Sequence, residues 1–289
     1  MNDRSVEVFL EQQPALRRLA YRMLGSVSLA EDAVQETWLR WSNVDPATIS
    51  SARAWLITAL SRICIDELRK AKRQRDVYAS PWLPEPYLEE VVSPELTAEL
   101  HSDISMAFLV LLERLSPEER IAFLLQEIFD NDYPTIAQIM AKSEVACRQL
   151  VHRARERVQQ GKSRFTADAF GRGELLRLFT QALSTNDAHA LLRALAPDVT
   201  LISDGGGKVR AASKPVQGAR AVSRLLMGTR KLQAAGSYIQ FREINGETGI
   251  VGFRGDGTKV FIMQFAMDPM QKISGIYLIN NPDKLVLAL

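Results

Sequence analysis

The sequence predicts a multidomain protein in which two all-α domains precede an α+β domain. Apolar residues recur at intervals of three and four along residues 1–77 and again along residues 104–165, as in packed helices. The second stretch contains a helix-turn-helix pattern between Asp132 and Val158. After residue 170, helical segments give way to strand-like runs separated by glycine turns, which indicates a bent antiparallel sheet with helices packed on it, an α+β cone.

The composition is that of a globular protein. Of 289 residues, 46% are apolar and 24% are charged, and the net charge of +2 means that nucleic-acid affinity must come from local clusters of basic residues. Cys64 and Cys147 occupy apolar positions in helical patterns, so we expect reduced core residues, with no metal site and no cofactor. The chain has no run of about eighteen apolar residues and no leader pattern, so a cytoplasmic protein without a membrane segment is expected.

The first predicted domain, residues 1–77, begins with a helix that Gly25 ends. Ser28 is the expected cap of the next helix, with Glu31 completing a capping box. In the segment AEDAVQETWLRW that follows, the apolar residues can bury on one side of a helix. The other side is either a solvated face or a docking surface, and it carries Asp32, Gln35, Glu36 and Arg40.

A basic helix is predicted next, from about residue 51 to residue 75, after a polar loop at 42–50. Its tail, LRKAKRQR, concentrates cations, and tryptophans lie close by in the sequence. A single-stranded DNA site needs cations for phosphates and a pocket or stacking surface for an unstacked base, although a charge run is more often merely solvated. If this helix forms a single-stranded DNA site, the residues expected to contact DNA are Arg53, Arg62, Arg69 and Lys70.

Residues 78–103 are expected to form a linker, because prolines interrupt any helix there and basic residues are absent. Trp82 and Leu83 are apolar residues in this acidic setting, and an exposed Trp leaves a large apolar surface unused. We therefore expect the WLPEP segment to dock on another part of the protein. The acidic residues in and beside the linker are Asp76, Glu85, Glu89, Glu90, Glu95, Glu99 and Asp103.

The helix-turn-helix lies in the second helical domain, residues 104–165. Ser116, Pro117 and Glu119 form a capping-box signature upstream of it. Pro134 starts the scaffold helix, Ala141 and Lys142 form the turn, and Ser143 caps the second helix. The residues expected to pack are Val145, Ala146, Leu150 and Ala154. The residues expected to face outward are Arg148, Gln149, His152, Arg153, Arg155 and Arg157.

Residues 170–289 form the predicted cone. Helices are expected around residues 175–183, 189–195 and 219–227, and strands at 199–202, 238–244, 248–253, 260–267 and 273–278. His189, Asp204 and Asp256 are the candidate acid–base residues, but the two aspartates lie in glycine turns, where Asp is common for conformational reasons. No convergent acid and base can be identified, so no catalytic residue is predicted.

The run LLERLSPEERIAFLLQEIFDNDYPTIAQIM, followed by SEVACRQLVHRARERV, resembles region 4 of extracytoplasmic-function sigma factors, and AEDAVQETWLRW resembles their region 2.2. The resemblance implies that the helix face at 32–40 docks on core RNA polymerase and that the basic helix at 51–75 opens the minus-ten element. It further implies that Arg148, Gln149, His152 and Arg153 contact the minus-thirty-five element. Ala141 departs from the family, which usually has glycine in the turn.

Three further motifs, WLPEP, DGGGKV and NPDKL, resemble those of the group of these sigma factors that carries a SnoaL-like C-terminal extension. The resemblance implies that the linker packs beside the end of the cone. The residues of this contact are Trp82, Leu83, Asn281, Pro282, Asp283 and Lys284.

The sequence therefore favours a sigma factor that binds core RNA polymerase and promoter DNA and is modulated by its own SnoaL-like domain, without a separate anti-sigma factor. The alternative is a SnoaL-like enzyme or small-ligand sensor fused to a DNA-binding module, with the ligand in the C-terminal domain. A simple ligand-responsive repressor is a third class, but it would have no use for the polymerase-docking face.

Overall fold

The computed structural model describes residues 3–45, 48–75, 81–87, 105–162, 169–230 and 236–287. The chain forms two compact units. The helical unit comprises Met1–Val77 and Leu109–Gln160, and the C-terminal unit comprises Tyr78–Phe108 and Gly161–Leu289. Of the predicted linker, residues 81–87 are described; apart from Glu85, the acidic residues named above lie outside the described residues, as do residues 46 and 47 of the predicted polar loop.

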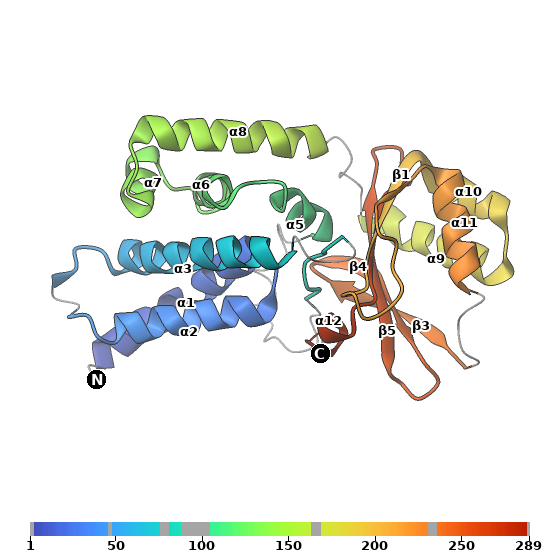
Figure 1. Ribbon diagram of the computed structural model, residues 1–289, viewed down its shortest axis with the longest axis horizontal. Helices are drawn as coiled ribbons and strands as arrows, with labels where there is room; N and C mark the ends of the chain where they lie inside the picture. Colours follow the sequence, from blue (N-terminus) through green and yellow to red (C-terminus); the bar gives the residue numbers. More distant parts are fainter. Residues whose placement is uncertain are drawn as a thin grey trace. The chain divides into compact units, whose positions relative to one another are not determined.

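The helical unit begins with three helices that pack against one another, as the apolar spacing predicts. They are α1 (Asp3–Leu24), α2 (Val27–Trp41) and α3 (Ala52–Arg75), shown in blue to cyan in Figure 1. Trp41 is fully buried at their centre. Its indole N–H donates to the Ser5 carbonyl at 2.9 Å, and its ring lies 5.3 Å from that of Trp55. Because the Trp41 ring is buried and its indole N–H is hydrogen-bonded, Trp41 fixes α2 against the neighbouring helices.

The junction of α1 and α2 differs from the prediction in one respect. Gly25 ends α1 with a φ of 63°, as expected, but the cap of α2 is Ser26 and not Ser28. Ser26 is extended, with φ −136°, and its hydroxyl accepts from Leu29 N–H at 3.3 Å. The helix starts earlier because the glycine turn leaves Ser26 as the last non-helical residue.

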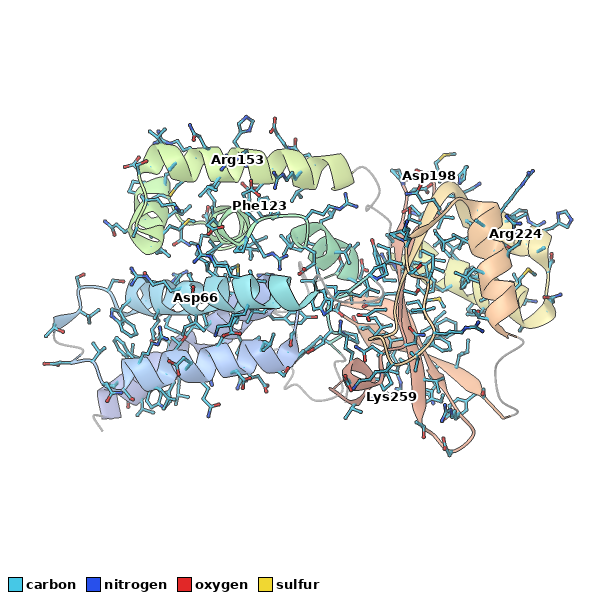
Figure 2. The ribbon with its side chains drawn as sticks, viewed as in Figure 1. Asp66, Phe123, Arg153, Asp198, Arg224 and Lys259 are labelled. Atoms are coloured by element: carbon cyan, nitrogen blue, oxygen red, sulfur yellow. The ribbon has the colours of Figure 1, made fainter. Side chains whose placement is uncertain are left out.

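Four further helices follow, α5 (Met106–Leu112), α6 (Pro117–Glu127), α7 (Tyr133–Met140) and α8 (Glu144–Lys162). The capping box at Ser116 and Glu119 is confirmed, with hydrogen bonds in both directions. Within the helical unit, α6 contacts α1 and α3, and α7 contacts α3. Arg120 of α6 is buried and donates to the Met23 carbonyl at 2.6 Å, so a charged side chain caps the end of α1 from another helix. Phe123, labelled in Figure 2, is buried in the same helix.

The C-terminal unit is an α+β domain built on one six-stranded sheet. Its helices are α9 (Ala169–Thr185), α10 (Ala188–Ala194), α11 (Ala219–Arg230) and α12 (Pro282–Leu287). Its strands are β1 (Leu195–Asp204), β2 (Val216–Gln217), β3 (Tyr238–Ile244), β4 (Glu247–Phe253), β5 (Lys259–Met267) and β6 (Ile273–Ile279). Each predicted strand corresponds to one of these strands. The NPDKL segment was predicted to be turn-like, but α12 begins within it.

The strand order is β2-β1-β6-β5-β4-β3. The hairpins predicted around Asn245-Gly246 and Gly255-Asp256-Gly257 join antiparallel pairs, β3 with β4 and β4 with β5. The expectation of a purely antiparallel sheet is wrong, because β1 and β6 pair in parallel. These two strands are separated by most of the domain, so no tight turn forces their directions to oppose.

Helices pack on both faces of the sheet, although β3 at its edge is largely exposed. Figure 1 shows α9, α10 and α11 on one face and α12 on the other. On the first face, Phe265 of β5 meets Phe179 of α9, with ring centroids 5.3 Å apart, inside the main core of the domain. Because side chains alternate along a strand, Ile262 and Gln264 of β5 point to the opposite face, where they are also buried. The strand ends near α12 are therefore part of a second, smaller packed layer.

Candidate functional site

Three of the four residues predicted to face outward on α2 are exposed. Asp32, Gln35 and Arg40 are exposed and Glu36 is half-buried, while Thr37 on the opposite side is buried. Arg40 Nε lies 2.9 Å from Glu36 Oε1, an exposed pair that fixes neither side chain strongly. Leu39, which sequence analysis did not single out, is 53% exposed on α2. The face therefore combines acidic, amide and apolar groups.

The four basic residues predicted to contact the minus-ten element are all exposed on α3, but they do not share one face. At 3.6 residues per turn, Arg62 and Arg69 lie on the same side of the helix, whereas Arg53 lies about half a turn away. Lys70 pairs with Glu67 at 2.7 Å. The structure thus brings Arg62 and Arg69 together and leaves Arg53 apart from them.

Arg69 forms an ion pair with a residue of α6 in the same helical unit. Its Nη2 lies 2.6 Å from Glu118 Oε1 at the start of α6. Burial of Glu118 by itself would raise the pKa of this carboxyl, but the hydrogen bond and charge of Arg69 hold the pKa below its ordinary value of 4.5. Sequence reasoning did not find this pair, because its partners are 49 residues apart.

Caps position the helix-turn-helix. The Ser143 hydroxyl accepts from Ala146 N–H at 3.2 Å, as the sequence predicts. The Asp132 carboxylate accepts from Thr135 N–H at 3.0 Å and caps α7, which begins at Tyr133, one residue before the predicted start at Pro134. Between α7 and α8, Ala141 adopts the left-handed conformation, with φ 50° and ψ 46°. This is the position where glycine is the usual residue, so Ala141 holds a conformation that costs an L-residue about 1 kcal/mol.

Arg148, Gln149, His152 and Arg153 are exposed on α8. Arg148 lies 3.0 Å from Glu144 and 5.2 Å from the centre of the Tyr133 ring. Arg153, labelled in Figure 2, lies 3.4 Å from Glu119, which also pairs with Arg157 at 2.5 Å. The acidic capping residue Glu119 therefore orients two arginines of the neighbouring helix.

One prediction for α8 is wrong. Val145 does not pack; it is 62% exposed. The buried stripe of α8 lies on the other side of the helix and consists of Cys147, Leu150, Val151, Ala154 and Val158. Val145 lies half a turn around the helix from this stripe. The prediction grouped it with Leu150 and Ala154, which do belong to the stripe.

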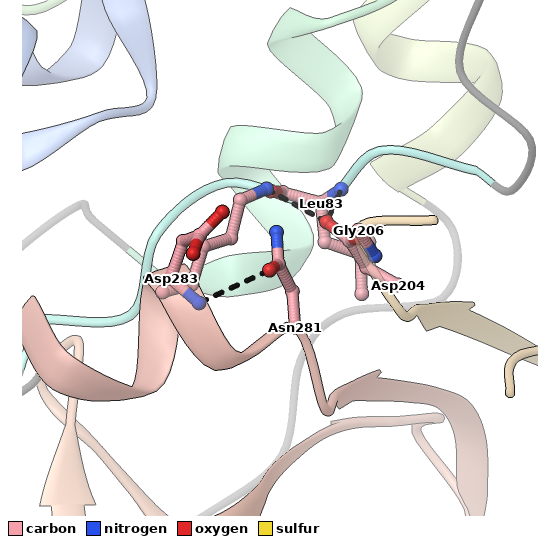
Figure 3. A network of polar contacts seen from close by, with 6 residues as sticks. Leu83, Asp204, Gly206, Asn281 and Asp283 are labelled. Atoms are coloured by element: carbon pink, nitrogen blue, oxygen red, sulfur yellow. Dashed lines mark hydrogen bonds and ion pairs between the residues drawn. The ribbon is translucent and has the colours of Figure 1, made fainter. Parts of the chain in front are cut away.

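A buried polar cluster joins residues 81–87 to the C-terminal domain (Figure 3). Leu83 N–H donates to Asp204 Oδ2 at 3.0 Å, and the Leu83 carbonyl accepts from Lys284 Nζ. Lys284 Nζ also lies 2.7 Å from Asp204 Oδ2 and 4.1 Å from the centre of the Trp82 ring. Both backbone polar groups of Leu83 are thus satisfied by side chains of the C-terminal domain.

The remaining residues of the predicted contact have different roles. Asn281 is buried, and its Oδ1 accepts from Asp283 N–H at 3.1 Å. Pro282 and Asp283 are exposed, and Asp283 pairs with Lys208 of the DGGGKV motif at 2.6 Å and not with the linker. Gly206 has φ 66°, and a Cβ there would meet the Asn281 side chain at 2.4 Å, so the DGGGKV and NPDKL segments approach closely only because this residue is glycine.

Asp204 is the central residue that sequence reasoning missed. It was interpreted as a turn residue or a catalytic candidate, but it ends β1, is fully buried and binds both Leu83 and Lys284. His189 and Asp256, the other candidates, are both exposed, and Asp256 accepts from Thr258 N–H in its turn. Within the described ranges, no group of three His, Cys, Asp or Glu residues could hold a metal ion.

Comparison with known proteins assigns the helical segments. Residues 8–74 match Sigma-70 region 2, and residues 105–158 match Sigma-70 region 4. The chain is 34% identical over 279 residues to the ECF RNA polymerase sigma factor SigJ of Mycobacterium tuberculosis, covering 93% of this chain and 89% of that protein. This chain belongs to the extracytoplasmic-function sigma factors.

The crystal structure of the M. tuberculosis SigJ sigma factor is similar over the whole length, with a TM-score of 0.78, 32% identity and coverage of 97% of this chain and 98% of that chain. A putative isomerase of the SnoaL-like family from Agrobacterium tumefaciens aligns with part of this chain with a TM-score of 0.29 and 10% identity, covering 38% of this chain and 97% of that chain.

As a sigma factor, the protein binds core RNA polymerase and promoter DNA and is not an enzyme. No helix within the described ranges is long and apolar enough to cross a membrane.

Proposed function

We propose that the SnoaL-like domain controls promoter recognition by this sigma factor by holding linker residues 81–87. The proposal rests on two hydrogen bonds to the Leu83 backbone, which we call the Leu83 grip. The Leu83 N–H donates to Asp204, and the Leu83 carbonyl accepts from Lys284. The Leu83 side chain is also fully buried. A shift of the linker by one residue would break both hydrogen bonds and expose Leu83, so the grip selects one register of the linker.

A second grip lies a few residues along the linker. Tyr87 N–H donates to Asn245 Oδ1 at 3.1 Å, and Asn245 N–H donates to the Tyr87 carbonyl at 2.9 Å. Pro84 and Pro86 stiffen the residues between the two grips, which limits the entropy lost when the segment docks. The segment 83–87 is therefore suited to stay bound as one piece.

Holding this segment affects the reach of the linker that connects regions 2 and 4. A free residue can span at most about 3.5 Å, so holding five residues fixes the length and direction of a segment that could otherwise extend to roughly 18 Å. Regions 2 and 4 must contact two separate promoter elements. Release or retention of the segment therefore changes whether both elements can be engaged at once.

The other surfaces take the following roles in this proposal. The face of α2 with Asp32, Gln35, Glu36 and Arg40 binds core RNA polymerase. The exposed basic residues of α3, with Arg62 and Arg69 on one side, contact the minus-ten element, and the exposed side of α8 contacts the minus-thirty-five element. The charge and exposure of these side chains support each role.

The experiment compares linker cleavage with transcription. Lys284→Met removes the cation from the Leu83 grip, and Trp82→Ala removes the ring stacked on it. Each variant should show faster proteolysis within residues 81–87 and should shift transcription by reconstituted holoenzyme in the same direction. The double variant should show less than the sum of the two effects, because both changes break one contact.

Asp283→Ala is the matched control, since it alters the same helix but leaves the grip on Leu83 intact. It should cleave and transcribe like the wild type. Wild-type cleavage rates for Lys284→Met, or fully additive effects in the double variant, would show that the grip does not control the linker.

A further inference from the structure

We infer that Val145 is a specificity-determining residue that recognises the methyl group of a thymine in the minus-thirty-five element. The inference rests on the proposed placement of α8 at that element. Its starting point is the exposure of Val145, which is 62% despite an apolar side chain in a short two-helix motif with a compact core. The packing of the helical unit does not account for this residue.

The position of Val145 on α8 points to DNA. Residues spaced by three, four and seven share one side of a helix, so Val145, Arg148, Gln149 and His152 form a single exposed stripe. All four are exposed, whereas the opposite stripe is buried. In a helix-turn-helix, residues near the N-terminal end of the second helix contact base edges. Val145 is the second residue of α8, within that end.

Within this stripe, Arg148 is the residue suited to hydrogen-bond a guanine. Its guanidinium lies 3.0 Å from Glu144 and 5.2 Å from the centre of the Tyr133 ring, and together these two contacts favour one direction of the exposed side chain. Arginine pairs best with the O6 and N7 acceptors of guanine. Val145 precedes Arg148 by three residues, about 4.5 Å along the helix axis, so both side chains can reach the same short stretch of bases. We therefore expect the thymine to lie close to a guanine in the element.

Valine suits the thymine methyl chemically. The C5-methyl group is the apolar feature that distinguishes thymine in the major groove, and small apolar side chains contact it. A β-branched side chain has few rotamers, so little freedom is lost on contact. The Val145 side chain has no hydrogen-bonding group, so the methyl group is the feature of a base edge that it is suited to recognise.

The test replaces thymine with uracil, which removes the methyl group and nothing else. Holoenzyme made with the full-length chain first selects a promoter from a library randomised in the minus-thirty-five element. Each thymine of the selected element is then replaced by uracil in turn. One replacement should weaken binding by the wild type roughly threefold to fivefold, the loss expected for one buried methyl group.

Val145→Ala should show the same loss on the thymine promoter and no further loss on the uracil promoter. Because Val145 is exposed, this variant should keep its far-UV helicity. Leu178→Ala, on the exposed side of α9, is the control and should still detect the methyl group.

Additive losses for Val145→Ala and the uracil replacement would overturn the inference, as would an element in which no uracil replacement matters. If instead Arg148→Ala leaves the selected minus-thirty-five sequence unchanged, the placement of α8 at this element fails. The two failures are therefore distinguishable.

Discussion

Lys284 and Asp204 form an ion pair in the interior of the C-terminal unit. Their Nζ and Oδ2 atoms are 2.7 Å apart, and their side chains are 6% and 0% exposed. Removing one partner of a buried pair leaves the other charge without compensation, at a cost of about 3–5 kcal/mol. Lys284→Met should therefore lower the free energy of unfolding of the full-length chain by that amount in urea titrations.

Asp283→Ala provides the comparison for this prediction. The pair between Asp283 and Lys208 is exposed on both sides, and such pairs contribute about 0–1 kcal/mol. If both variants lose the same stability, burial does not set the strength of the Lys284 pair. Adding Asp204→Asn to Lys284→Met should recover part of the loss, since it removes the uncompensated charge.

Ala141→Gly should stabilise the protein. Ala141 holds φ 50°, which glycine adopts without the clash of a Cβ, so a gain of about 1 kcal/mol is expected. Ala146→Gly in the first turns of α8 should destabilise by about 0.5–1 kcal/mol, because the helix interior disfavours glycine. Denaturant midpoints of the two variants should move in opposite directions, and movement in the same direction would contradict the role of the turn conformation.

Arg148→Ala and Arg153→Ala should affect promoter binding differently. We propose that Arg148 lies on a stripe that reads bases, so its loss should cost about 1–3 kcal/mol at one position of the element. Arg153 is displaced around the helix and pairs with Glu119, and we propose that it contacts phosphate, so its loss should weaken binding to all promoters and lower the salt slope by roughly 0.9. Holoenzyme titrations at several salt concentrations separate the two effects. Arg177→Ala on α9 should change neither quantity.

The combined change of Asp32, Gln35 and Glu36 to alanine should abolish assembly with core RNA polymerase. Interface groups of the polymerase left without partners cost about 1–3 kcal/mol each. The changes lie on the exposed or half-buried side of α2, so far-UV helicity should be unchanged. Co-elution with core polymerase at wild-type strength would remove these residues from the interface, and Glu174→Ala on α9 should co-elute normally.

The pair between Arg69 and Glu118 should make the stability of the helical unit depend on pH. The pKa of Glu118 is lowered in the folded protein, so the pair contributes fully above the ordinary value of 4.5, and its contribution is lost as the pH falls through the lowered pKa. The stability difference between the wild type and Glu118→Gln should therefore be constant from neutral pH down to 4.5 and should shrink below it. A constant difference in more acidic solution would contradict this assignment.

Local chemistry made much of the fold predictable. Ser116 and Ser143 cap helices as their sequence context indicates, and Asn245-Gly246 forms the expected hairpin turn. These features depend on residues a few positions apart. The parallel pairing of β1 with β6 depends on strands at opposite ends of the domain, and no local pattern encodes it.

The candidate sites were predictable to a different extent. Exposure of the α2 and α8 polar residues follows from helical periodicity, and the exposure of all but the half-buried Glu36 and Arg155 agrees with it. Asp204 was hidden because an Asp before three glycines is explained equally well by a turn, and its partner Lys284 is 80 residues away. Val145 was misplaced because an apolar residue at the start of a helix can belong to either side.

The distance in sequence between Leu83 and Lys284 also has a consequence for the order of events during synthesis. The two residues are 201 positions apart, so a ribosome working at 5–20 residues per second adds Lys284 roughly 10–40 s after Leu83. By the end of that interval the segments of regions 2 and 4 have both been made, while the Leu83 carbonyl still lacks its Lys284 partner. Each newly made sigma factor therefore passes through a period in which its linker is not yet fully held.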